Sequence, residues 1–228
     1  MLLKILPTEK EILLILNKID IIVLKFESNN DPLSVSITDN GNYYGLYQLS
    51  SSSGTVKNFI EFIKNTKYYN ELNSLKIDSD DFITKWKELS NNQEFIDLQY
   101  DFIINTYYNP SKDNLKDEYY NMDKHSYAMK CVLLSRTIQY SPYYMVELYK
   151  EALKKFNYLN LSYVDDSYFD KDMIVYIYDF LIKECDDVKK DEHNIYHSPN
   201  DWCNGNYSLI QNLKNRFIKE KEFALSLL

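Results

Sequence analysis

The sequence predicts a mainly helical α+β domain, and three observations lead to this fold class. The chain has 228 residues, of which 45% are hydrophobic and 26% charged, so it can bury one substantial core. After residue 54, apolar residues recur mostly at the spacing of an α-helix. The stretch 33–49 instead alternates polar and apolar residues as a strand does. We therefore expect a single domain over 1–228, with a hairpin region at about 33–50 and a helical remainder.

The first helix is expected to begin just after Pro7. Thr8 and Glu11 have the spacing of a capping box, which satisfies free N–H groups of a first helical turn. Residues 28–32 include two Asn, one Asp and one Pro, which disfavour continuing the helix, so we expect it to end there. Between these limits, one continuous apolar face is formed by Ile12, Leu16, Ile19, Val23 and Phe26.

A β-hairpin is expected directly after this helix. In residues 33–38 Leu, Val and Ile alternate with Ser and Thr, which is the period of a short strand. The sequence Asp-Asn-Gly-Asn at 39–42 favours a hairpin turn, and 43–49 can return as a second strand. Helical patterns follow over 55–65, 79–89, 92–107, 124–139, 142–156, 170–185 and 207–226.

Charge and composition exclude several classes of function. The net charge of −8 and the pI near 5.0 argue against nucleic acid as a partner, because a protein that tracks phosphates needs a basic surface. Residues 1–6 are too short for the apolar region of a signal peptide. No membrane insertion is expected either, since the next apolar stretch contains Asn17, Lys18, Asp20 and Lys25.

Neither the cysteines nor the histidines suggest a metal site. Cys131, Cys185 and Cys203 are odd in number and widely spaced, which favours reduced thiols over a disulfide framework. His193 and His197 have a helical spacing that would suit a metal, but no third ligand is evident, so solvated loop histidines are favoured. No metal and no cofactor is expected.

Glu27 is the leading candidate for catalysis. It lies at the C-terminal end of the apolar helix, one turn after Val23 and beside Phe26. Apolar surroundings and the negative end of the helix dipole both favour the protonated carboxylic acid. An acid that keeps its proton near neutral pH can protonate a glycosidic oxygen. The alternative is an ordinary solvated glutamate at a helix end, and the segment that follows favours the catalytic interpretation.

A second carboxylate, Asp39, lies at the turn of the expected hairpin. A loop carboxylate facing a helix-borne acid across a cleft is the usual arrangement for glycoside hydrolysis. In that position Asp39 would orient a water molecule or stabilise positive charge developing on the sugar. The alternative is a turn-forming aspartate before Asn-Gly, which the hairpin favours for local reasons.

Residues 43–49 supply candidate sugar contacts. Gly45 allows a backbone to approach a ligand closely, and Gln48 can hydrogen-bond a sugar or hold Glu27. Tyr44 and Tyr47 offer flat amphipathic rings that suit stacking on sugar faces. By itself this string is also compatible with a plain aromatic strand.

The segment 26–55 resembles a known family. Its Glu-Ser pair at a helix end, Asp-Pro, an Asp in a Gly/Asn turn and Tyr-Gly-x-Tyr-Gln-Leu-Ser are similar to phage-type peptidoglycan hydrolases. The most similar members are lysozyme-like domains of clostridial phage endolysins and tail-associated lysins, and of type VI secretion spike proteins. A less specific likeness extends through 98–110, 126–141 and 213–220.

The resemblance implies a lysozyme-like fold, with a small hairpin next to the catalytic helix, that cuts β-1,4 bonds of peptidoglycan as a muramidase. It implies Glu27 as general acid and Asp39 as the second carboxylate, with Tyr44, Gln48 and Gln139 in the cleft. Departures from the family pattern put the specificity of the sugar-binding subsites in question. They are Ser36-Ile37-Thr38 and Asn42 in the turn, and Arg136, Tyr140 and Ser141 in a cleft-facing helix.

Other functions stay open at this point. One group is a lytic transglycosylase, glucosaminidase or chitosanase on the same fold, and another is a non-catalytic glycan-binding component of a phage tail or secretion apparatus. The expected partners are peptidoglycan glycan strands, with a holin or a phage-tail-like particle for delivery. We expect synthesis in the cytoplasm without a signal peptide and action at the bacterial cell wall after release.

Overall fold

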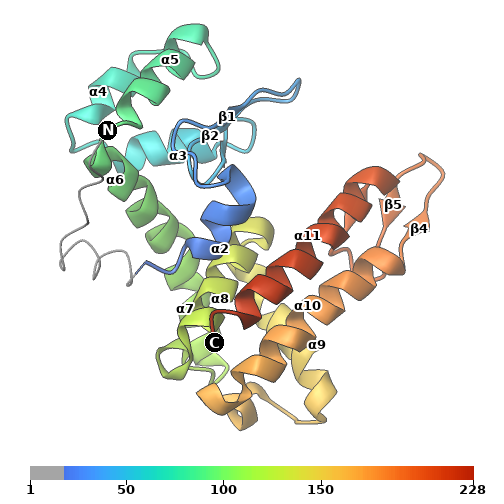
Figure 1. Ribbon diagram of the computed structural model, residues 1–228. Coiled ribbons are helices and arrows are strands. Elements are labelled where there is room, and N and C mark those ends of the chain that lie inside the picture. The colour runs from blue at the N-terminus through green and yellow to red at the C-terminus, as the bar shows by residue number, and fades with distance from the viewer. Residues whose placement is uncertain (1–17) are drawn as a thin grey trace, which may run out of the picture.

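A computed structural model describes residues 18–228 and consists mainly of helices, with two small antiparallel sheets (Figure 1). The capping box at Thr8 and Glu11 lies outside the described residues. The chain forms a small lobe, made of the first sheet and α3 to α6, and a large lobe of α7 to α11. The prediction of a mainly helical α+β fold with a small β region beside the candidate acid is confirmed.

The helix that carries Glu27 is short. It consists of α2 (Ile21–Val23) and a π-helical turn, η1 (Leu24–Ser28). Its end is where the sequence predicts it, because Asn29 takes a left-handed conformation with φ of 53°. A one-turn widening of this kind changes the direction of the side chains that follow it and is frequent at functional sites.

The sequence predicts one continuous helix that includes Ile19. This prediction is wrong at that position, because residues 18–20 are not helical. Tyrosine hydroxyls from other elements satisfy the backbone there. The hydroxyl of Tyr127 donates to the carbonyl of Lys18 at 2.9 Å, and the N–H of Ile19 donates to the hydroxyl of Tyr100 at 3.4 Å. The apolar spacing that suggests a helix here in fact reflects burial of an irregular segment.

The first sheet joins β1 (Val35–Ser36), β2 (Tyr43–Tyr44) and β3 (Leu49–Ser50) in antiparallel order. The predicted hairpin is present as β1 and β2, but the expected second strand over 43–49 is interrupted. Residues 45–48 form a turn that needs two positive φ angles, 70° at Gly45 and 49° at Gln48. Glycine adopts such angles without strain, so the break occurs where the sequence permits it.

The small lobe packs around an aromatic core. Its helices are α3 (Thr55–Phe62), α4 (Tyr68–Asn73), α5 (Asp80–Leu89) and α6 (Gln93–Ile103). Phe59 and Trp86 are fully buried, with ring centroids 5.5 Å apart, and both also contact Phe95. Helix α4 has no counterpart in the sequence prediction, because six residues are too few to establish a period.

The large lobe follows from the small one without a break. Helix α6 continues through a π-helical turn, η2 (Ile104–Tyr108), into α7 (Asn109–Asp117), so the predicted helix over 92–107 extends further than expected. Pro110 lies in the first turn of α7, directly after the π-helical turn. The remaining α-helices of residues 18–228 are α8 (Tyr127–Tyr140), α9 (Met145–Leu153), α10 (Asp170–Asp186) and α11 (Tyr207–Leu225), and short 3-10 helices lie between several of them.

A second sheet lies in the connection between α10 and α11, which we call the arm (residues 187–206). It comprises β4 (Lys189–Lys190), β5 (Tyr196–His197) and β6 (Asn204–Gly205). The arm projects from the end of these two helices (Figure 1). Here the sequence prediction of a loop with solvated histidines is incomplete, since His197 lies on a strand.

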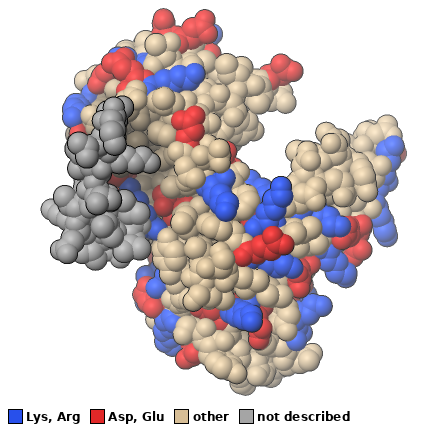
Figure 2. Space-filling model, in the orientation of Figure 1, with Lys and Arg blue, Asp and Glu red and all other residues tan. Residues whose placement is uncertain are grey.

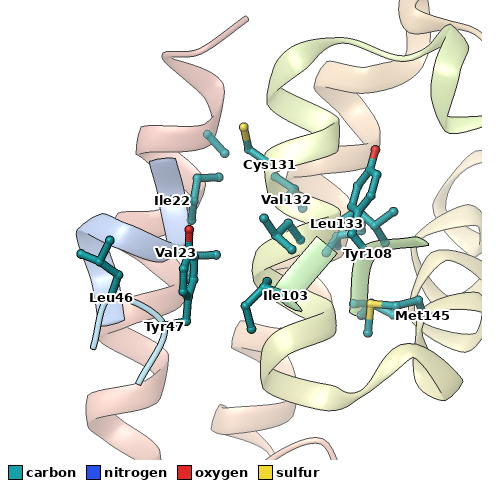
Figure 3. Close-up of a cluster of buried hydrophobic side chains, with 14 of the residues drawn as sticks. Ile22, Val23, Leu46, Tyr47, Ile103, Tyr108, Cys131, Val132, Leu133 and Met145 are labelled. Atoms are coloured by element: carbon teal, nitrogen blue, oxygen red, sulfur yellow. The ribbon is translucent and has the colours of Figure 1, made fainter. Parts of the chain in front are cut away.

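Helix α2 is held in place by a cluster of buried hydrophobic side chains (Figure 3). Ile22 and Val23 point toward Val132 of α8, with Tyr47 and Ile103 closing the same cluster. All five side chains are at most 2% exposed. This packing fixes the turn that follows α2 and therefore the direction of Glu27. Within residues 18–228 no helix has the length and apolar character needed to cross a membrane.

Candidate active site

Glu27 lies at the border between the two lobes and is partly buried. Its side chain is 20% exposed, and the preceding residues of α2 anchor it to the core. The π-helical turn closes through a hydrogen bond of 2.8 Å from the N–H of Asn30 to the carbonyl of Leu24. Ser28 adds a hydroxyl that donates to the same carbonyl at 3.4 Å. Glu27 is therefore positioned by backbone geometry as well as by packing.

The partner of Glu27 is Arg216, which comes from α11. The guanidinium Nη2 of Arg216 donates to Oε1 of Glu27, and its Nε donates to Glu220 Oε1 at 2.6 Å. Burial acts to lower the pKa of Arg216, but the carboxylates of Glu220 and Glu27 together raise it above its ordinary value. Arg216 therefore stays cationic and bridges two carboxylates.

Behind Arg216 lies a buried polar network centred on Glu220. The side chains of Glu220 and Arg136 are both fully buried and form an ion pair. Tyr178 donates its hydroxyl to Oε2 of Glu220 at 3.1 Å, and the ring of Tyr178 lies 5.3 Å from the guanidinium carbon of Arg136. Arg136 also donates to Oε1 of Gln139 at 2.7 Å. Two acids and two arginines thus connect Glu27 with α8 through alternating charges.

A cleft of about 320 Å³ opens at Glu27. Figure 2 shows the surface hollowed between the small lobe and the arm. Both lobes contribute to the lining: the first sheet and the start of α3 on one side, and α8, α11 and η2 on the other. The lining residues are Glu27, Tyr43, Tyr47, Gln48, Leu49, Ser50, Ser53, Thr55, Ile103, Tyr107, Ile138, Gln139 and Arg216.

Three of the predicted sugar-binding residues line this cleft. Tyr47 lines the cleft although it is only 2% exposed, and its hydroxyl donates to Asp20 Oδ2 at 2.5 Å. Gln48 is held inside the sheet rather than against Glu27: its amide nitrogen donates to the carbonyl of Gly45 at 2.9 Å, and its oxygen accepts from Ser36 at 2.9 Å. Gln139 lies at the end of α8.

Tyr44 and Gly45 do not lie at the cleft, which corrects the expected placement. Tyr44 is fully buried against Phe82, and burial raises the pKa of its hydroxyl to about 12. The hydroxyl donates to Asp78 at 2.9 Å. A side chain at Gly45 would overlap the buried amide of Gln99. The alternating directions of strand side chains send Tyr43 toward solvent and the cleft, and Tyr44 toward the core.

Asp39 is exposed in the turn between β1 and β2 and does not line the cleft with Glu27. Its turn is closed by the N–H of Gly41, which donates to the carbonyl of Thr38 at 3.2 Å. The structure therefore places Asp39 on the hairpin that borders the cleft region, as the sequence predicts, but does not bring the two carboxylates together. Among residues 18–228, Glu27 is the only carboxylate in the lining.

Most residues that line the cleft are not predicted by the sequence. Arg216 and Glu220 are four residues apart on one helix face, the spacing of an ion pair, and this was the available signal for them. Tyr43, Tyr107 and Thr55 carry no signal of their own, because only the folded chain brings their segments together. In the part of the chain that the structure describes, no cluster of three or more potential metal ligands is found.

Comparison with known proteins identifies the family. The family model "Type VI secretion system spike protein VgrG3-like, C-terminal" matches residues 21–221. The chain belongs to this family. Of the relatives that the sequence motifs suggest, the spike proteins are thus the kind that the match supports.

A curated relative supports the same family. Over 209 residues the chain is 26% identical to the type VI secretion system spike protein VgrG3 of Vibrio cholerae, with 89% of the chain covered. The chain spans only 18% of the length of that relative.

Solved structures with a similar fold are chitosanases. A GH46 chitosanase from Gynuella sunshinyii, solved with chitotetraose, has a TM-score of 0.59 and 13% identity over 97% of this chain and 90% of its own. The native chitosanase of Bacillus subtilis MY002 also has a TM-score of 0.59, with 18% identity over 92% of this chain and 88% of its own. At these identities the likeness establishes the fold.

Proposed function

We propose that this domain is a glycoside hydrolase that cleaves β-1,4 bonds in the glycan strands of peptidoglycan, in the manner of a muramidase. The observation that carries the proposal is a single carboxylate, Glu27, held by Arg216 in a cleft between two lobes. A cleft open along the junction of two lobes accommodates a chain-like substrate. The lysozyme-like fold agrees with this chemistry.

In the proposed mechanism Glu27 donates its proton to the glycosidic oxygen of the leaving sugar. Arg216 holds one carboxylate oxygen, Oε1, and so fixes the rotamer of the Glu27 side chain that lines the cleft. After proton transfer the guanidinium stabilises the carboxylate that remains. Arg216 also forms an ion pair with Glu220, so its positive charge is divided between two carboxylates, Glu27 and Glu220. Asp39 assists a water molecule or the oxocarbenium-like transition state, and this requires the hairpin to approach the bound sugar.

The composition of the cleft favours an acetylated glycan over chitosan. Chitosan is polycationic, and a site for it should offer several carboxylates. Among the described residues the lining holds one carboxylate and one guanidinium, with the remainder hydroxyl, amide, aromatic and aliphatic groups. Tyrosine rings, serine hydroxyls and glutamine amides suit uncharged sugars with N-acetyl groups. Chitosanase activity is thus the second candidate, which the test below distinguishes.

The test compares wild-type protein with Glu27→Gln on purified peptidoglycan, acetylated chitin oligomers and chitosan. The glutamine variant keeps a hydrogen bond to Arg216 but carries no transferable proton, so cleavage should fall by about 10²–10⁴-fold. Mass spectrometry of the products identifies the bond cut. Reducing N-acetylmuramic acid ends mean a muramidase, reducing N-acetylglucosamine ends a glucosaminidase, and anhydro ends a transglycosylase.

A matched control is Glu61→Gln, which removes an exposed glutamate paired with Lys64 and should leave cleavage unchanged. Equal cleavage by wild type and Glu27→Gln would remove Glu27 from the mechanism. Faster cleavage of chitosan than of peptidoglycan would overturn the substrate assignment. No cleavage of any polymer by folded wild-type protein would leave a glycan-binding component as the better interpretation.

We further propose that a type VI secretion apparatus, rather than a holin, delivers this domain from the cytoplasm to the cell wall. The family match to the C-terminal part of a spike protein supports this route. Release of the protein should stop when the contractile sheath of the apparatus is deleted. Release that persists without the sheath, or a mature N-terminus cut by a signal peptidase, would contradict the proposal.

A further inference from the structure

Two of the three cysteines meet at the base of the arm. Cys185 lies in the last turn of α10, and Cys203 directly precedes β6. Their Sγ atoms are 2.7 Å apart, closer than two sulfur atoms that only touch. Both side chains are buried, at 0% and 1% exposure. Eighteen positions separate the two residues in the chain, so the fold and not local sequence brings them together.

Neighbouring hydrogen bonds and aromatic packing hold Cys185 and Cys203 close together. Glu184, the neighbour of Cys185, accepts hydrogen bonds from the backbone N–H of Asn200 at 3.0 Å and from its side chain at 2.7 Å. The N–H of Cys203 donates to Ser198 Oγ at 3.0 Å. Trp202 packs its ring 5.9 Å from Phe180 of α10. These hydrogen bonds and the packing of Trp202 therefore hold the segment with Cys203 against α10, with the two sulfur atoms in contact.

Cys131 belongs to a different part of the molecule. It lies on α8 and faces the cluster around α2 (Figure 3). It is fully buried there and shares a contact with Tyr127. The chain thus contains one pair of adjacent thiols and one isolated thiol, which the spacing of cysteines in the sequence does not reveal.

We propose that Cys185 and Cys203 form a disulfide bond when the chain folds or refolds outside a reducing compartment, in the presence of a disulfide oxidant. In this exchange one cysteine thiolate attacks the oxidant's disulfide, which forms a mixed disulfide and releases one thiolate of the oxidant. The second cysteine thiolate then attacks the cysteine sulfur of the mixed disulfide and releases the other thiolate of the oxidant. The two thiols lose two protons and two electrons in total, and one disulfide of the oxidant becomes two thiols. Oxidised glutathione supplies this chemistry in vitro.

The bond would close residues 186–202 into a loop that contains β4 and β5, so it would tie the arm to α10. Because Cys203 lies just before α11, the bond also fixes the start of the helix that carries Arg216. This inference concerns the stability of the arm and does not depend on the proposed enzymatic function. Burial keeps the thiols from a soluble oxidant in the folded state, so the bond is expected to form during refolding.

The test refolds the full chain from denaturant, either with a reductant or with mixed oxidised and reduced glutathione. Thiol-reactive labelling under denaturing conditions should count three thiols in the reduced protein and, after loss of one pair, a single thiol in the oxidised protein. A tryptic digest without reductant should join peptide 184–189, which contains Cys185, to peptide 191–214, which contains Cys203. The oxidised form should melt about 5–10 °C higher than the reduced form.

Single-cysteine variants serve as controls. Cys131→Ser should still form the bond and show the shift in melting temperature, whereas Cys185→Ser and Cys203→Ser should show neither. If a serine variant does not fold, the peptide map of the wild-type protein still decides. Three free thiols after oxidative refolding, or a bond that includes the peptide with Cys131, would overturn the proposal.

Discussion

Glu27 and Arg216 are 189 positions apart in the chain, yet their side chains form the central ion pair of the cleft. From the sequence, Glu27 is expected in apolar surroundings. The structure instead provides an arginine, and the side chain is one-fifth exposed. The position of the Glu27 carboxylate is therefore set by its ion pair with Arg216 as well as by partial burial. The second predicted acid, Asp39, lies in the turn that its local sequence predicts, but it does not line the cleft with Glu27 as expected.

Asp39→Asn tests the role of the hairpin carboxylate. If Asp39 approaches the sugar during the reaction, the rate of peptidoglycan cleavage should fall at least about tenfold, because a positioned acid or base commonly contributes 10²–10⁴. Asp31→Asn is the matched control, since Asp31 is an exposed aspartate in the neighbouring turn that only accepts from the N–H of Leu33 at 3.0 Å. A loss similar to that of the control would limit Asp39 to shaping the turn.

Asp20 should make stability depend on pH. Burial raises the pKa of this carboxyl above its ordinary 3.8, although the hydroxyl of Tyr47 opposes the shift. A raised pKa means that the folded state favours the proton, so the contribution is fully present below the ordinary value and is lost as pH rises through the folded value. Asp20→Asn removes this dependence and keeps an oxygen acceptor for Tyr47.

The measurement for Asp20 is the free energy of unfolding of both proteins at about pH 3 and at about pH 7. The variant should gain stability relative to wild type between the two, by about 1.4 kcal/mol for each unit by which the pKa is raised. A difference between the proteins that is the same at both pH values would contradict the prediction.

At the scale of elements, the first sheet determines which side chains reach the cleft. Its expected second strand is divided by the turn at 45–48. This turn brings Gln48 and the largely buried Tyr47 to the lining of the cleft, whereas Tyr44 does not reach it. Hydrophobic periodicity indicated a β region but not the turn inside it. The turn depends on positive φ angles and on hydrogen bonds of Gln48 to the sheet, and neither has a repeating signal in the sequence.

Gly45→Ala should destabilise the protein for two reasons. The φ of 70° is unfavourable for alanine, and the new methyl group would overlap Gln99 Oε1 and lie 3.2 Å from Nε1 of Trp86. We expect a loss of about 2–3 kcal/mol in the free energy of unfolding, measured by denaturant titration. Gly54→Ala is the control, because its φ is 79° but a methyl group there meets nothing within 4 Å. Equal losses would mean that the overlap with Gln99 contributes nothing.

At the scale of the whole molecule, the charge network connects the candidate acid to the large lobe. Glu220 lies between Arg216 and Arg136, and the pair of Glu220 with Arg136 is fully buried. Such a pair contributes little net stability when complete, because desolvation offsets the attraction. Removal of one partner, however, leaves the charge of the other uncompensated in the core. The network therefore holds α8 and α11 in the arrangement that positions Arg216.

Glu220→Gln should lower the free energy of unfolding by about 3–5 kcal/mol, because Arg136 stays buried without its counter-charge. Thermal and denaturant unfolding measure the effect. The matched control is Asp179→Asn on α10, which removes the surface pair with Lys221 and should cost no more than about 1 kcal/mol. Losses of similar size in the two variants would show that the network carries no special structural role.

The sequence alone determined the fold class, most helices, the turn at 39–42 and the candidate acid. These features rest on local physics: apolar spacing selects helices, Asn-Gly selects a turn, and Asn29 ends the helix that carries Glu27. Only the tertiary structure decided what surrounds that acid. Arg216, the tyrosines of the cleft and the approach of Cys185 to Cys203 come from segments distant in the chain. Such contacts depend on how elements pack against one core, and the spacing of residues along the chain carries no record of that packing.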